Sequence, residues 1–157
     1  ALAGVTKPVL YQHFPSKREL YIELVEGVSN QLAESVTTAV RSETSARGQA
    51  VSALTAYFRF VDDNQREFHL LFGRSAPREE EFGSGSRMVE DRMADTITEL
   101  LDKRLDLETR QVFARAIVGM SEGVCRHWVA QETRPSAESL AKQIADLLIS
   151  GLAGLHS

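Results

Sequence analysis

Cysteine and histidine are the side chains in this 157-residue sequence that could serve as a nucleophile or a metal ligand. Cys125 and His127 lie two positions apart on a predicted helix, so their side chains point in different directions and cannot form a nucleophile–base pair. The four histidines have no spacing typical of metal ligands. The three consecutive glutamates at 79–81 stand in a polar segment, where solvated charge is expected rather than acid–base catalysis. We therefore interpret Cys125 as a buried structural thiol and expect no enzyme, no metal and no cofactor.

Contact with nucleic acid is the chemistry that the N-terminal end indicates. Residues 1–18 contain Lys7, Lys17 and Arg18 and no acidic residue, in a chain whose net charge is −4. A short basic segment on an acidic chain is typical of a protein that meets a polyanion at one end. Lys17 also follows a predicted N-cap, and the N-terminus of a helix favours a phosphate.

Two short helices joined by a tight turn are predicted to present these cations. Gly4 suits the turn, and Thr6 is a typical N-cap for the second helix. On that helix Leu10 and Phe14 share one face, which we expect to be buried. Gln12 lies on the opposite face, where its amide could read a base edge in the major groove of DNA.

The stretch that starts at Gly4, GVTKPVLYQHFPSKRELY, resembles the helix-turn-helix signature of the TetR family of bacterial transcriptional regulators. Its Leu-Tyr-x-His-Phe-x-Ser-Lys core is highly specific, whereas the rest of the chain resembles the family in the number and order of its helices. The resemblance implies a recognition helix over 7–13 and contacts to phosphates from Tyr11, His13 and Lys17. The DNA-contacting residues that we expect are Thr6, Lys7, Pro8, Tyr11, Gln12, His13 and Lys17.

The sequence begins without Met, as if a helix were already under way. In the family, a first helix and most of a second precede the motif and cover the helices that remain here. We therefore expect binding to operator DNA only when these upstream helices are restored. The alternative, from a different class, is a helical interaction module that does not bind DNA.

Apolar residues recur at spacings of three and four, which predicts an all-α protein. The predicted helices cover 16–41, a region around 51–61, 66–72, 88–101, 106–132 and 136–155, and 73–86 is predicted to be a loop. The first long helix is expected to bury a stripe of Leu20, Leu24, Val28, Leu32, Val36 and Val40. Ser16, Asp106 and Ser136 are predicted N-caps, and Gly48 is predicted to separate two helices.

Composition limits the class of protein further. Hydrophobic residues make up 43% and charged residues 25%, as in soluble globular proteins. No apolar run approaches the length of a membrane span, so no membrane partner is expected. With one cysteine in the chain, we expect a reducing compartment, the cytoplasm. We divide the chain into the C-terminal part of a DNA-binding domain, 1–22, and a helical domain for effector binding and dimerisation, 23–157.

The helix predicted over 106–132 has apolar residues around much of its circumference. Large side chains define one face, namely Phe113, Ile117, Met120, Val124 and Trp128, and small residues define a second face, namely Ala116, Gly119 and Gly123. Such a helix is expected to be buried on more than one side. Because small residues let helices approach closely, we expect a homodimer through the last two helices.

Large aromatic and sulfur-containing side chains fall on the inward stripes of the middle helices. The residues that could line a ligand pocket are Phe58, Phe68, Phe72, Met93, Met120 and Trp128. The polar residues that could orient a ligand there are His69, Thr96, Ser121 and Arg126. The alternative for each is that it fills a core. The family resemblance implies a small-molecule effector and, most often, a repressor that the effector releases from its operator.

Overall fold

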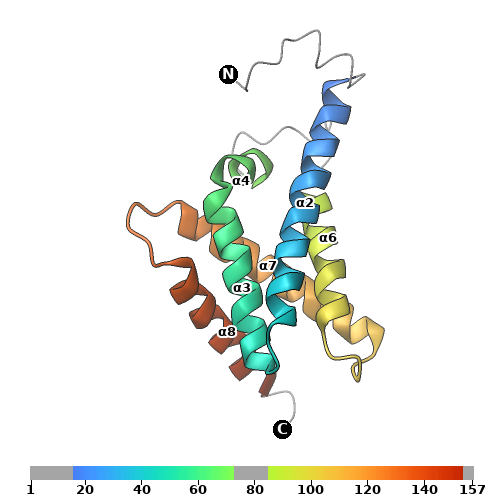
Figure 1. The fold of residues 1–157 in the computed structure, drawn as a ribbon, viewed down its shortest axis with the longest axis vertical. Coiled ribbons are helices and arrows are strands. Elements are labelled where there is room, and N and C mark those ends of the chain that lie inside the picture. The colour runs from blue at the N-terminus through green and yellow to red at the C-terminus, as the bar shows by residue number, and fades with distance from the viewer. Residues whose placement is uncertain (1–15, 73–84, 154–157) are drawn as a thin grey trace.

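The computed structural model describes residues 16–72 and 85–153, which form six helices and no strand (Figure 1). The helices are α2 (Lys17–Arg41), α3 (Ala46–Asp63), α4 (Gln65–Phe72), α6 (Gly85–Leu100), α7 (Leu107–Val129) and α8 (Ala137–Ala153). The prediction of an all-α protein is therefore confirmed. No helix within these ranges is both long and apolar enough to cross a bilayer.

Capping side chains determine where four of these helices begin. Each accepts a hydrogen bond from a backbone N–H of the first turn, which has no partner within the helix. The pairs are Ser16 with Glu19 (3.1 Å), Ser45 with Gly48 (3.0 Å), Asp106 with Thr109 (2.9 Å) and Ser136 with Ser139 (3.2 Å). The predicted caps Ser16, Asp106 and Ser136 are thus confirmed.

Gly48 does not separate two helices, contrary to the prediction, because it lies in the first turn of α3. A Cβ atom at this position would come within 2.5 Å of Glu43 Oε2 and 2.9 Å of Ser45 Oγ. Glycine therefore allows the short connection after α2 to close tightly over the start of α3. Gly48 thus leaves room for the side chains of Glu43 and Ser45 near the helix. The sequence pattern alone cannot distinguish a glycine of this kind from one that ends a helix.

Two other boundaries differ from the predictions. Gly85 and Ser86 were expected in a loop, but they form the start of α6, and Gly85 is buried. Helix α7 ends at Val129 rather than near residue 132, because Ala130 takes the C-cap and its N–H bonds to the carbonyl of Trp128. Segment 73–84 of the predicted loop lies outside the described residues.

The helices pack as a chain of neighbours around α3 and α2 (Figure 1). Helix α3 contacts α2 on one side and α8 on the other, and α6 packs against both α2 and α7. Two apolar clusters result. The first joins α3, α4, α7 and α8 around Phe58 and Trp128, and the second joins α2 and α6 around Val25, Val36 and Met93.

The buried stripe of α2 begins on different residues from those predicted. Tyr21, Val25 and Ser29 are buried, whereas Leu24 is 53% exposed. A series that takes every fourth residue turns by about 40° at each step, because a helix advances about 100° per residue. The predicted stripe therefore leaves the buried face at its N-terminal end, although Leu32 and its later members remain on it.

Helix α7 is buried on one side within this chain, not on several. Its buried residues are Ala114, Ser121, Cys125 and Trp128. Of the predicted large face, Trp128 is buried and Phe113, Ile117, Met120 and Val124 are half-buried. The small face of Ala116, Gly119 and Gly123 is exposed, and no atom lies within 4 Å of where a Cβ would stand on either glycine. No described element of the same chain covers this face.

Candidate functional site

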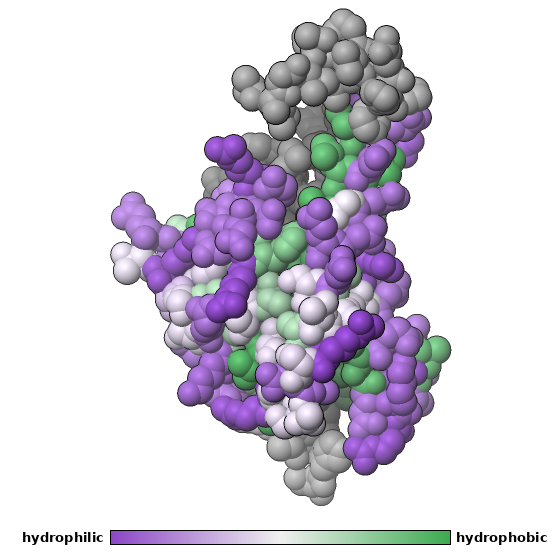
Figure 2. Space-filling model, viewed as in Figure 1, coloured by the Kyte–Doolittle hydropathy of each residue, from purple (hydrophilic) through white to green (hydrophobic). Residues whose placement is uncertain are grey.

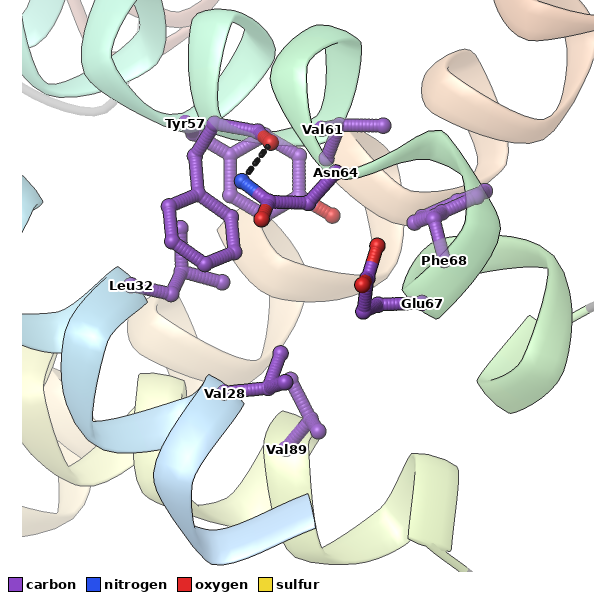
Figure 3. Close-up of a pocket in the computed structure, with 9 residues that line it drawn as sticks. Val28, Leu32, Tyr57, Val61, Asn64, Glu67, Phe68 and Val89 are labelled. Atoms are coloured by element: carbon purple, nitrogen blue, oxygen red, sulfur yellow. Dashed lines mark hydrogen bonds between the residues drawn. The ribbon is translucent and has the colours of Figure 1, made fainter. Parts of the chain in front are cut away.

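A cleft lies among α2, α3, α4 and α6 (Figure 3). Its lining residues are Val28, Leu32, Tyr57, Phe60, Val61, Asn64, Glu67, Phe68 and Val89. Val28 and Val89 point into it from α2 and α6, opposite the residues of α3 (Figure 3). Apolar surface also gathers between α2 and α3 on the face drawn in Figure 2. Seven of the nine lining residues are apolar or aromatic, so the cleft suits a mainly apolar molecule.

The cleft is nearly closed in this conformation. It encloses about 20 Å³, within about 330 Å³ of empty space that is continuous with solvent. A volume of 20 Å³ holds one or two water molecules, because one water needs roughly 10–15 Å³ on this measure. A larger ligand can enter only if a wall moves. Helix α4 is the shortest of the helices that form the walls, with eight residues.

Polar groups enter the cleft at the junction of α3 and α4. The side-chain amide of Asn64, the C-cap of α3, donates to the carbonyl oxygen of Phe60 at 2.8 Å. The carboxylate of Glu67 extends from α4 toward Asn64 (Figure 3). These two side chains place hydrogen-bonding atoms at one end of an otherwise apolar cleft, where they could orient a ligand.

Tyr57 is half-buried and places its phenol at the inner wall of the cleft. Its ring meets the ring of Phe58 edge-on, with centroids 5.5 Å apart. Burial raises the pKa of the phenol well above its usual value of 10.0, and the neighbouring Cys125 and Glu122 add to the shift. The phenol shares a hydrogen bond with the thiol of Cys125, whose own pKa burial raises to about 12. Both groups are therefore neutral at physiological pH, and Cys125 lies buried as an unreactive thiol.

The structure separates the residues that were predicted to line a pocket. Phe58, Phe68 and Trp128 belong to one apolar cluster, in which the rings of Phe58 and Trp128 are 5.9 Å apart. Met93 is buried in the other cluster, and Met120 is half-buried on α7. Among these five, Phe68 lines the cleft. The side chain of Phe72 lies outside the described part of the structure.

The predicted polar contacts are also dispersed. His69 is exposed, and Ser121 is buried on α7. The hydroxyl of Thr96 donates to the carbonyl of Arg92 at 2.8 Å, while Arg126 forms an ion pair with Glu122. Asn64 and Glu67 occupy the cleft instead.

A helical pattern that includes polar residues could have identified the cleft. Tyr57, Phe60 and Asn64 follow one another at spacings of three and four on α3, so they share a face. The residues predicted for the pocket were chosen for size and sulfur content, and Asn64 was not among them. Its position as the C-cap and its place in the cleft are both consequences of the one-residue junction between α3 and α4.

The described part of the predicted DNA-contacting end consists of the start of α2. Lys17 is its first residue and is exposed, directly after the N-cap Ser16. Free backbone N–H groups and the positive end of the helix dipole lie at this point, so an anion is favoured there. The other predicted contacts, at positions 6–13, lie outside the described residues.

Within residues 16–72 and 85–153 no group of three or more metal-binding side chains could hold a metal ion. His127 is exposed and contacts Gln131 at 2.8 Å between Nε2 atoms.

The chain combines a helix-turn-helix signature at the N-terminal end of its sequence with helices around a mainly apolar cleft, a combination that defines a class of one-component transcriptional regulator. Two family models match the chain. "Bacterial regulatory proteins, tetR family" matches residues 1–24, and "Tetracyclin repressor-like, C-terminal domain" matches residues 46–151. The chain therefore belongs to the TetR family of DNA-binding transcriptional regulators.

Curated relatives cover most of the chain. The HTH-type transcriptional activator FasR of Mycolicibacterium smegmatis is 27% identical over 152 residues, which are 96% of this chain and 69% of FasR. The nucleoid occlusion factor SlmA of Marinomonas sp. is 24% identical over 82% of this chain and 69% of its own length. SlmA of Haemophilus influenzae is 25% identical over 89% of this chain and 68% of its own length.

Proposed function

We propose that the segment from Thr6 to Lys17 contacts operator DNA. The outward position of Gln12 on the predicted recognition helix suits a base contact, and the other predicted contacts suit the phosphate backbone. Exposed Lys17 at the N-terminus of α2 supports a phosphate contact at this end. A protein that binds operator DNA acts where that DNA lies, so we assign this protein to the cytoplasm.

A small, mainly apolar effector binds in the cleft and controls this DNA contact. The observation that carries the proposal is that α2 serves both sites. It begins at Lys17, and its residues Val28 and Leu32 line the cleft. Because the closed cleft holds only one or two water molecules, an effector must displace α2 or α4 to enter. A displacement of α2 changes the position of the DNA-contacting end.

The direction of control that we propose is the one that the family resemblance implies. An effector shifts the population to a conformation that binds the operator more weakly. The protein is then a repressor that is released by its effector, although the relative FasR carries the name of an activator. Its function is binding without catalysis.

The residues first predicted for the pocket support the cleft from behind. Phe58 and Trp128 belong to the same apolar cluster as Phe68, which lines the cleft, and Met93 belongs to the cluster that contains Val89. Met120 is half-buried on α7, and the side chain of Phe72 lies outside the described residues, so a ligand contact by either stays a prediction. Direct contact with the effector falls to the lining residues, with Asn64 and Glu67 setting its orientation.

A thermal-shift screen with small apolar compounds tests the effector proposal. A compound present at 100 times its dissociation constant should stabilise the folded protein by about 2.7 kcal/mol. Val28→Trp should fill the cleft and abolish this shift. Leu24→Trp adds the same side chain to the same helix at a position that is 53% exposed, so it should leave the shift unchanged. Equal shifts in the wild type and Val28→Trp, or no stabilising compound in a broad screen, would contradict the proposal.

A homodimer through α7 and α8 is the second part of the proposal. The exposed small face of α7, Ala116, Gly119 and Gly123, lets another helix approach its backbone closely. Exposed apolar side chains occur on both helices, with Val112 and Leu147 each 60% exposed. Covering them with a second copy removes this apolar surface from water.

A further inference from the structure

Arg134 lies in the connection between α7 and α8 and contacts two distant parts of the chain. Its guanidinium stacks on the ring of Trp128, 4.5 Å from the ring centroid, and forms an ion pair with Asp62 in the last turn of α3. The side chain of Arg134 is 23% exposed and that of Asp62 is 42% exposed, so water reaches the ion pair mainly from the side of Asp62. The indole N–H of Trp128 donates to the carbonyl of Pro135 at 2.9 Å, which holds the ring against the same connection.

Asp62 connects this contact to the start of α4. The same carboxylate oxygen, Oδ1, accepts hydrogen bonds from Arg134 and from the side-chain amide of Gln65, the latter at 2.9 Å. Gln65 also donates to the backbone carbonyl of Asp62 at 3.2 Å and is the first residue of α4. We call the set of Asp62, Gln65, Trp128 and Arg134 the clasp.

The clasp lies directly beside the residues that form one end of the cleft. Asn64, between Asp62 and Gln65, lines the cleft, and so do Glu67 and Phe68 on the first turns of α4. Phe68 also packs in the cluster that contains Trp128. The direction in which α4 leaves α3 is therefore set by side chains that the α7–α8 connection holds in place.

We propose that Arg134 is a positioning residue that holds α4 in its closed place over the cleft. Through the clasp, opening of α4 is coupled to the α7–α8 connection. This inference rests on the proposed function in one respect, since it assigns the clasp to regulation of the effector cleft. The position of α4 itself can be measured without any effector or DNA.

Hydrogen exchange of the ligand-free full chain tests the proposal, with Arg134→Gln as the variant. Loss of the charge removes both the ion pair and the cation–π contact, so local opening of α4 should become more frequent. The amides of residues 65–72 should exchange several-fold faster, while those of α2 and α6 should keep the wild-type rate. Binding of the uncharged apolar dye Nile red to the cleft should rise in parallel.

Arg59→Gln is the matched control. Arg59 pairs with Glu138 at 2.6 Å and thus also links α3 to the start of α8, but among the described residues it forms no hydrogen bond or ion pair with α4. It should leave α4 exchange and dye binding unchanged. If Arg134→Gln fails to fold, Asp62→Asn is the second variant. The new asparagine side chain loses the ion pair with Arg134, but its amide oxygen can still accept a hydrogen bond from Gln65. This variant should also accelerate hydrogen exchange in α4.

Two results would overturn the proposal. One is equal α4 exchange in the Arg134→Gln and Arg59→Gln proteins. The other is an acceleration that extends evenly through α2, α3 and α8, which indicates a general loss of stability. If α4 exchange responds as expected but no compound binds in the cleft, the clasp stands and the effector proposal fails.

Discussion

Tyr57 and Cys125 bring two titratable groups together behind the cleft. Burial raises the pKa of both, well above 10.0 for the phenol and to about 12 for the thiol, whose usual value is 9.0. In the unfolded chain both groups ionise at their usual values. The folded state therefore holds these protons to a higher pH than the unfolded state does, and its stability becomes dependent on pH in the alkaline range.

The pH range follows from the sign of these shifts. A raised pKa leaves the stability contribution intact below the unfolded pKa and removes it as the pH rises toward the folded pKa. For Cys125 the loss therefore begins near pH 9.0 and continues to about pH 12. Above pH 10.0 the loss from Tyr57 is added.

We predict that urea denaturation shows a fall in the free energy of unfolding above pH 9.0, with a contribution from Cys125 of up to about 1.4 kcal/mol per pH unit. Cys125→Ala should be less stable at neutral pH, because it removes a buried side chain, but its slope between pH 9.0 and 10.0 should be shallower. Below pH 10.0 Tyr57 contributes little, so this range isolates the thiol. Identical slopes in the two proteins would refute the assignment.

Helix α7 has one buried side and one side that is exposed within a single chain. Its buried side carries Cys125 and Trp128, while Gly119 and Gly123 face outward with nothing near them. Glycine in a helix interior costs about 1 kcal/mol relative to alanine. Two such residues on one exposed face are explained by a second helix that approaches closely, as in the proposed dimer.

We predict that Gly123→Arg yields a monomer in light scattering, because a long charged side chain cannot be buried in a close helix contact. The monomer itself should fold, since the site is open within one chain and arginine is a better helix former than glycine. Gly27→Arg is the control, because Gly27 is an equally open glycine on α2. The Gly27→Arg protein should remain a dimer. A dimeric Gly123→Arg protein would place the interface on another surface.

The sequence predicted the positions of the helices better than it predicted which side of each helix is buried. Each helix predicted within residues 16–72 and 85–153 is present. The caps Ser16, Asp106 and Ser136 could be recognised because an N-cap depends on residues within one turn. The face of α2 that is buried could not be read from spacing alone, since both Leu24 and Val25 are apolar and the packing of α3 and α6 selects Val25. For the same reason residue types could not show which side of α7 would face a neighbour.

The cleft was only partly predictable. Phe68 was foreseen, but Phe58 and Trp128 were assigned to the pocket because they are large, and they fill the core behind it. A cleft arises where neighbouring helices fail to fill the space between them, and this depends on crossing angles that a single sequence does not specify. The clasp at Arg134 joins residues 72 positions apart, and no local pattern predicts it.

At the scale of the whole molecule, α2 connects the proposed DNA-contacting end to the cleft. It is continuous from Lys17 to Arg41, so it passes through the boundary at 22 that we placed between two domains. A continuous helix transmits a displacement along its length more directly than a flexible connection does. We therefore expect the proposed effector binding and the proposed DNA binding to be coupled through this one continuous helix.

The proposal that the motif at residues 6–17 binds DNA is tested most directly by measuring affinity for a DNA duplex. The parent protein in this experiment is the unsubstituted protein with the upstream helices, and the duplex is one selected for binding to it. The variants are made in the same protein. Gln12→Ala should lose about 1–3 kcal/mol at one base pair and change sequence preference. Lys17→Ala should weaken all duplexes alike and reduce the slope of log affinity against log salt by about 1.

Arg41→Ala is the control in the same measurement, because Arg41 is an exposed cation at the opposite end of α2. It should bind every duplex with the affinity and salt dependence of the parent. We predict this separation of three behaviours: altered preference for Gln12→Ala, uniform weakening for Lys17→Ala and no change for Arg41→Ala. Parent-like binding by both the Gln12→Ala and Lys17→Ala proteins would contradict the assignment of DNA binding to this end of the molecule.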